Sequence, residues 1–228
     1  SETEFSGTSH SVDYDEARQL PITVSEGNAT HVRNITWHPT FRLPTQIDET
    51  GGKRTVNTYD ERGNLTEQTI TATSGPTTSQ TWRWAYNANN LPVSETDPRG
   101  STTTHTYNSA GQRTSSTNAL GHVTTFGYDP AGRLNRITQP DGLVQTMVYT
   151  PRGWLSQSTL TAGSSALTTR YTYAPSGQVT QLRLPNGHVI DYRYDAAERL
   201  IGWTDNRNQR ADYTLDPMGN ITQELVRN

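Results

Sequence analysis

The sequence contains no cysteine, which excludes a disulfide framework, a thiol nucleophile and a zinc–thiolate site. It also lacks any run of about 18 apolar residues, so no segment is expected to span a membrane. Apolar residues make up 30% of the chain, against about 45–50% in an ordinary globular domain. The net charge of −3 indicates neither disorder nor a nucleic-acid partner. A thick hydrophobic core is therefore not expected.

The first residues show no signal for export. The sequence starts with Ser1 rather than methionine, and it has no basic segment followed by an apolar one. We therefore expect these 228 residues to be a middle section of a longer chain.

What the sequence does contain is a repeat with a period of about 21 residues. Each unit begins with an aromatic residue, usually followed by Asp or Asn, by Gly at the fourth position and by an apolar residue at the sixth. Nine repeat aromatic residues occur, with Leu215 in the same position of a tenth unit: Tyr14, Trp37, Tyr59, Tyr86, Tyr107, Tyr128, Tyr149, Tyr173 and Tyr194. The turn glycines are Gly63, Gly111, Gly132, Gly153, Gly177 and Gly219.

The array is regular over most of its length. Residues 1–56 form degenerate Tyr-Asp (YD) repeats, in which Arg18 and Phe41 stand in the glycine position. Residues 57–228 form regular YD repeats, lengthened by turn-rich insertions at 71–80 and 161–167. Because extra residues in a loop cost little closure entropy, one continuous array is expected.

The repeat predicts an all-β fold made of hairpins. Asp and Asn side chains initiate turns, and Gly supplies the positive φ that closes them. Residues 122–128 and 133–139 lie between turns, are rich in Thr, Val, Tyr and Ile, and are therefore predicted strands. Two strands a unit give about twenty antiparallel strands. Since open sheets rarely exceed about ten strands without curling, we expect one curled sheet, a YD-repeat β-hairpin spiral.

No catalytic residue, metal site or cofactor is predicted. The six histidines show no metal-ligand spacing, although His122 and His188 occupy the same position of their units. No pair of carboxylates stands out from the turn positions, and no GxSxG motif occurs. One alternative stays open: Trp82, Trp84 and Tyr86 alternate along one predicted strand and could stack on sugar rings, or they could simply form side-chain ladders of the sheet.

The motif Tyr128-Asp129-x-x-Gly132-Arg133-Leu134, followed by Pro140-Asp141-Gly142, closely resembles the YD repeat of Rhs proteins. The pattern recurs at Tyr59, Tyr107, Tyr173 and Tyr194. The resemblance implies part of a hollow β-shell, as in Rhs polymorphic toxins, insecticidal toxin complexes and teneurins. The segment from Leu215 to Gly219 begins like the shell-closing DPxGLxGG motif of the family but then departs from it, so Asp216 is interpreted as a turn residue.

The resemblance also implies a non-enzymatic function and a set of partners. We expect the chain to help encapsulate a toxin cargo domain of the same parent chain, which is secreted or delivered from a bacterial cell in bacterial competition. A secretion apparatus, such as type VI secretion, or a chaperone would bind other parts of the parent. The alternative is a carbohydrate- or receptor-binding adhesin repeat on the cell surface. Exposed edge strands of the ribbon could also pair with a second copy.

Overall fold

The computed structural model describes residues 2–3, 9–26, 31–76 and 78–227. These residues form strands and turns without helices, so the predicted all-β class is confirmed. Within these ranges, no helix has the length and apolar character needed to traverse a bilayer. The chain divides into two compact units, Ser1–His122 and Val123–Asn228.

The described residues form 21 strands, close to the twenty predicted. Those of the first unit are β1 (Glu2–Thr3), β2 (Ser9–Asp15), β3 (Leu20–Glu26), β4 (His31–Trp37), β5 (Pro44–Glu49), β6 (Lys53–Tyr59), β7 (Leu65–Ala72), β8 (Thr78–Tyr86), β9 (Pro92–Thr96), β10 (Thr102–Tyr107) and β11 (Arg113–Thr117). Those of the second are β12 (Val123–Tyr128), β13 (Leu134–Thr138), β14 (Val144–Tyr149), β15 (Leu155–Ala162), β16 (Ser165–Tyr173), β17 (Val179–Arg183), β18 (Val189–Tyr194), β19 (Leu200–Asp205), β20 (Arg210–Leu215) and β21 (Ile221–Arg227).

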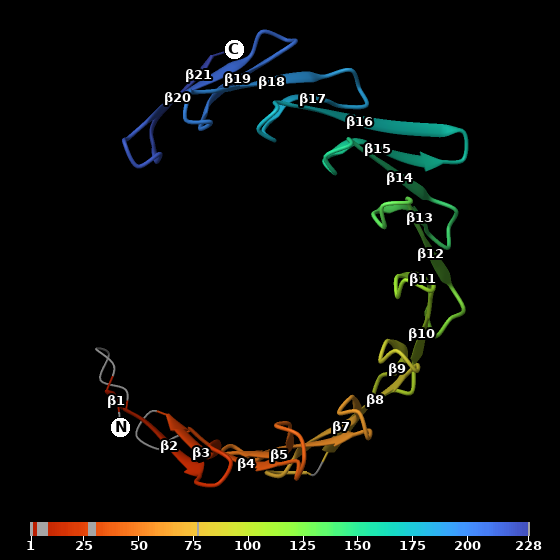
Figure 1. Cartoon of the computed structure of the whole chain (residues 1–228), viewed down its shortest axis with the longest axis vertical. Coiled ribbons are helices and arrows are strands. Elements are labelled where there is room, and N and C mark those ends of the chain that lie inside the picture. Colours follow the sequence, from red (N-terminus) through yellow and green to blue (C-terminus); the bar gives the residue numbers. More distant parts are fainter. Residues whose placement is uncertain (1, 4–8, 27–30, 77, 228) are drawn as a thin grey trace. The chain divides into compact units, whose positions relative to one another are not determined.

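Within each unit, every strand pairs antiparallel with the strand that precedes it in the chain. Figure 1 shows the strands of the first unit following one another along a curved ribbon, and those of the second unit doing the same. Contacts join only consecutive strands, so each ribbon is one layer thick.

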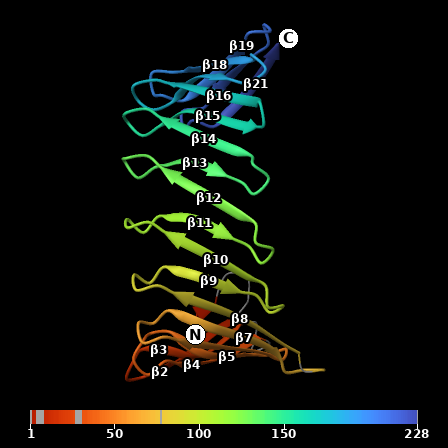
Figure 2. The ribbon, with the colours of Figure 1, turned by 90° about the vertical axis from the view of Figure 1, so that its right-hand side faces the viewer.

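The hairpin turns alternate between the two long edges of each ribbon, as Figure 2 shows. We call the edge with the turns that follow the repeat aromatic residues the first edge, and the opposite one the second edge. On the first edge the register shifts by one residue just before the aromatic residue, for example between Gly127 and Tyr128. Such a shift is typical of a type I turn followed by a left-handed residue, the three-residue hairpin with a bulge.

A single-layer ribbon cannot bury much side-chain surface. Of the described residues, only Leu20, Asn57, Gly202, Asp205 and Ala211 are buried. The expectation of no thick core is therefore confirmed, and stability must come from the strand ladders and from side chains that bridge neighbouring hairpins. The last strand, β21, is exposed along its whole length.

Candidate functional site

The first-edge turn is the element that the repeat encodes most directly. In the unit that starts at Tyr128, the Asp129 Oδ1 atom accepts hydrogen bonds from the backbone N–H of Ala131 at 3.0 Å and of Arg133 at 2.9 Å. Gly132 follows with a φ of 80°. These hydrogen bonds hold the pKa of Asp129 below its usual value, and the bond from the Arg133 backbone N–H has the largest effect. The carboxylate therefore acts as a turn-closing acceptor.

Four units build the same turn without the expected residue. Asn90 and Glu198 occupy the glycine position with φ values of 59° and 62°. In the first unit the left-handed residue is Gln19, one place later than the predicted position. In the second, His38 replaces the Asp, and its Nδ1 atom lies 3.2 Å from the backbone nitrogens of Thr40 and Phe41. The turn can therefore form with different residues at the Asp and Gly positions, as long as a hydrogen-bond acceptor or a residue in the left-handed conformation is present.

The repeat aromatic residues stand where each first-edge turn begins. Eight of them are the last residue of a strand: Trp37, Tyr59, Tyr86, Tyr107, Tyr128, Tyr149, Tyr173 and Tyr194. Tyr14 is one residue from the end of β2 and is 53% exposed.

In six units the tyrosine hydroxyl joins the unit to the one before it. Tyr149 Oη donates to the backbone carbonyl of Leu134 at 2.7 Å, and that residue opens β13, the first strand after the aromatic residue of the preceding unit. The same bond recurs in five other units: Tyr59 to Pro44, Tyr86 to Leu65, Tyr107 to Pro92, Tyr173 to Leu155 and Tyr194 to Val179. Trp37 supplies its indole N–H to the carbonyl of Pro21 at 2.7 Å instead.

These bonds satisfy carbonyls that the strand ladder leaves unpaired. Leu134 pairs with Tyr128 on the β12 side, but the pairing of β13 with β14 starts only at Arg136, so β14 offers Leu134 no partner. Burial raises the pKa of the phenols of Tyr59, Tyr86, Tyr173 and Tyr194 above the ordinary value of 10.0, so they are protonated donors even in mildly alkaline solution. The repeat aromatic residue is thus a hydrogen-bond donor as well as a packing residue.

Replacing Tyr149 by phenylalanine is expected to lower the free energy of unfolding by about 1 kcal/mol, because a half-buried carbonyl loses its donor. Tyr171→Phe is the matched control, since its hydroxyl makes no hydrogen bond to another described residue and should change stability by less than about 0.5 kcal/mol. Urea denaturation of both variants measures the difference. Equal losses would show that the hydroxyl bond contributes nothing specific.

A second contact joins neighbouring first-edge turns, and the sequence analysis missed it. The residue just after the glycine position reaches the turn of the next unit. The Arg133 guanidinium lies 4.8 Å from the Tyr149 ring centroid and donates to the carbonyl of Thr150 at 3.2 Å. Trp154 takes this position in the next unit and packs against Tyr173, with ring centroids 5.2 Å apart and the ring planes tilted by 40°. The signal in the sequence is weak because Arg, Trp, Asn and Gln all fill the position.

The predicted aromatic row lies on one face of β8. Trp82, Trp84 and Tyr86 are half-buried there, and the residues between them are exposed. Gln68 lies opposite Trp82, and Glu95 opposite Trp84. Stacking of sugars on this row stays a prediction.

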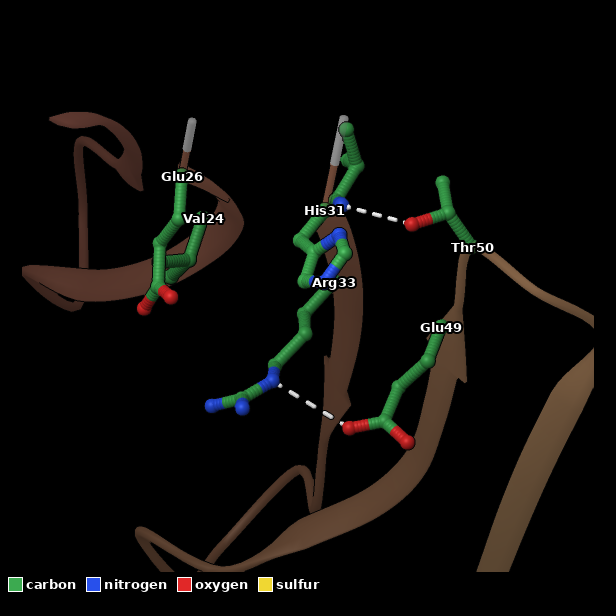
Figure 3. A pocket seen from close by; sticks show the side chains of 7 residues that line it. Val24, Glu26, His31, Arg33, Glu49 and Thr50 are labelled. Atoms are coloured by element: carbon green, nitrogen blue, oxygen red, sulfur yellow. Dashed lines mark hydrogen bonds and ion pairs between the residues drawn. The ribbon is translucent and has the colours of Figure 1, made fainter. Parts of the chain in front are cut away.

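A small pocket of about 180 Å³ in the first unit is lined by charged residues of β3, β4 and β5 (Figure 3). Glu49 lies between two cations: its Oε1 is 3.2 Å from Arg33 Nε, and its Oε2 is 2.9 Å from Lys53 Nζ. The hydrogen bond from Lys53 is the main cause of the lowered pKa of Glu49. These charges neutralise one another on an exposed surface, where each pair contributes less than about 1 kcal/mol.

Two of the histidines on the half-buried face have an unusual environment. Among the described residues, three buried side-chain atoms lack a hydrogen-bond partner: His105 Nδ1, His188 Nδ1 and Asp205 Oδ2. Burial lowers the pKa of His105. His188 Nε2 lies 3.4 Å from Asp205 Oδ2, and this aspartate side chain is only 1% exposed. The sequence analysis compared His188 with His122 and did not foresee its contact with Asp205.

Comparison with known proteins identifies the family to which this repeat belongs. The RHS Repeat family matches residues 59–102, 86–123, 107–144 and 173–202, which together make up just over half of the chain. No curated protein matches.

Several solved structures are similar. The crystal structure of TcdB2–TccC3–Cdc42 matches 98% of this chain with a TM-score of 0.77 and 16% identity. The Photorhabdus luminescens Tc holotoxin pore matches 96% with a TM-score of 0.75 and 15% identity, and TcdB2–TccC3 without its hypervariable C-terminal region matches 96% with 0.76 and 16%. The chain covers 14% of each of those chains, and at such identities the similarity shows the fold alone.

Proposed function

Because the chain belongs to the RHS repeat family, we propose that it is a section of the wall of a β-shell that encloses and shields a toxic domain of the same parent chain. The observation that carries the proposal is the run of consecutive hairpins in each unit, with a chain that matches Tc toxin structures over nearly all its length. A secreted or delivered location in a bacterial system follows from the same proposal, with the secretion apparatus or chaperone bound by other parts of the parent.

The mechanism is steric enclosure rather than catalysis. Every hairpin presents polar strands and closed turns, and each contacts only its neighbours. An unbroken layer of this kind keeps proteases and other proteins away from an enclosed domain. Its function therefore depends on many equivalent contacts between hairpins. The tyrosine–carbonyl bonds and the first-edge contacts are the elements that keep neighbouring hairpins in register. We propose no enzymatic activity for the described residues.

Limited proteolysis of the full-length gene product tests this function. We expect the segment that follows the repeats to resist a protease that digests it readily when it is produced alone. A variant that breaks the ribbon, Gly202→Ala, is expected to abolish this protection, whereas Tyr171→Phe should leave it intact. A gene product whose repeats lead to a surface anchor, without a protected domain, would instead favour the adhesin.

A further inference from the structure

The two hairpins with the longest strands, β7–β8 in the first unit and β15–β16 in the second, both carry an arginine three residues before the repeat aromatic residue. In the first hairpin this residue is Arg83, which lies directly opposite Glu67 on β7. The two side chains form an ion pair with an Nε–Oε2 distance of 2.9 Å. On the other side, Arg83 faces the uncharged Thr96 of β9. The charge of this arginine is therefore neutralised by its strand neighbour.

The second hairpin lacks the acid and gains a second cation. Its arginine is Arg170, and Gln157 lies opposite it where the first hairpin has a glutamate. On the other side, Arg183 of β17 lies directly opposite Arg170. Like charges in this arrangement destabilise a sheet. We call these two exposed residues the arginine pair, and neither of them forms an ion pair or a hydrogen bond with another described residue.

The acidic strand residues on the same face of the second unit are already engaged. The strand register places two of them there, Asp191 and Asp212. Asp191 Oδ1 accepts a hydrogen bond from Gln181 Nε2 at 2.8 Å. Asp212 forms an ion pair with Arg193, and its Oδ2 lies 3.4 Å from Arg210 Nε. The arginine pair therefore keeps two charges that no neighbouring carboxylate compensates.

The chemistry of the pair favours an oxyanion. A guanidinium group is planar and donates parallel hydrogen bonds to the oxygens of a carboxylate or a phosphate. Directly opposed residues have Cβ atoms about 5 Å apart, so both groups can reach the same oxyanion. An anion bound between them would also remove the repulsion between the two charges.

The surroundings of the pair limit the kind of partner. The aromatic residues within the strands of the second unit alternate with the residues of this face and lie on the opposite one: Phe126, Tyr171, Tyr192, Trp203 and Tyr213. The face therefore offers no ring for stacking on nucleic-acid bases or for insertion into a bilayer. A long polyanion would also lie along the rest of the chain, and the net charge of −3 would repel it.

We propose that the arginine pair is a docking site for a short acidic segment of a polypeptide, with an Asp or Glu carboxylate bound between Arg170 and Arg183. Charge complementarity supplies the attraction, and a short segment contacts only this part of the chain. The site does not depend on the shell function.

Calorimetric titration of the whole chain with a capped hexaglutamate peptide tests the site. We expect saturable binding at low ionic strength and its loss at about 1 M salt, where charges are screened within about 3 Å. Arg183→Thr introduces the residue type that the first hairpin has at this position, and it should weaken binding about tenfold because one guanidinium is removed. Gln157→Glu supplies the missing acid beside Arg170 and should weaken binding to a similar extent, because the new carboxylate competes with the peptide.

Urea denaturation of the same two variants separates loss of the site from loss of the fold. Arg183→Thr removes a repulsion and Gln157→Glu adds an ion pair, so both should raise the urea midpoint of the free protein at low ionic strength. Weaker binding together with a higher midpoint would support the proposal. A lower midpoint in both variants would contradict the repulsion on which the proposal rests.

Two control variants remove the same charge elsewhere. Arg83→Gln alters the neutralised arginine of the first hairpin, and Arg136→Gln alters an exposed arginine on the same face, three strands from Arg170. Each should change the affinity by less than about twofold. Equal weakening in both controls and in Arg183→Thr would show that binding follows net charge, which would overturn the proposal. The absence of saturable peptide binding, or binding of phosphatidylserine vesicles or inorganic phosphate in place of the peptide, would overturn it too.

Discussion

Replacing Gly202 by alanine is expected to destabilise the second unit by about 3 kcal/mol or more. A Cβ atom at this position would lie 2.3 Å from the carbonyl oxygen of Ala211 and 2.6 Å from Arg193 Nη2. The arginine can move, but the carbonyl belongs to β20, which is paired with β19. Relief of the clash therefore requires that the two strands separate.

Gly127→Ala is the matched control, because Gly127 also lies within a strand. Its added Cβ would lie 3.2 Å from Arg136 Cβ and from Asn135 Oδ1, so the asparagine side chain can turn away and β13 has to shift by only a few tenths of an ångström. We expect a loss below about 1 kcal/mol. Urea denaturation followed by circular dichroism measures both variants. Similar losses in the two proteins would contradict the argument from the β20 carbonyl.

Replacing Gly132 by valine is expected to cost about 2–3 kcal/mol, because a β-branched residue is strongly disfavoured at its φ of 80°. Gly132→Asn should cost only about 1 kcal/mol or less, since Asn tolerates the left-handed conformation and Asn90 adopts it at the equivalent position. Hydrogen exchange of the amides in β12 and β13 reports the change locally. Equal loss of protection in both variants would show that the turn conformation is not what the glycine provides.

Sequence reasoning succeeds here where the cause of a structure is local. The Asp129 turn needs an acceptor, a type I turn and a left-handed residue within five positions, and all three are visible in the sequence. The aromatic residue that precedes it marks the end of a strand for the same reason. From these local features, repeated at a fixed interval, the all-β hairpin ribbon could be predicted.

What the sequence analysis missed depends on neighbours in space. The partner of the Tyr149 hydroxyl is a backbone carbonyl, which has no sequence signature. His38 could not be identified as a turn acceptor because a histidine in the Asp position has many alternative uses. His188 and Asp205 are 17 residues apart in successive units, and only the pairing of β18 with β19 brings them together.

The tyrosine–carbonyl bond has a consequence for how such a chain can evolve. Six units donate a tyrosine hydroxyl to the unit before them, and units such as those of Tyr149 and Tyr173 also offer a carbonyl to the unit after them, so their hydrogen-bonding needs are the same. Duplication or deletion of one whole unit therefore restores every bond across the new junction, whereas a gain or loss of a few residues within a strand does not. Unequal recombination between repeats can lengthen or shorten the ribbon in steps of about 21 residues at little cost in stability. The number of hairpins is thus a quantity that selection can adjust independently of the fold.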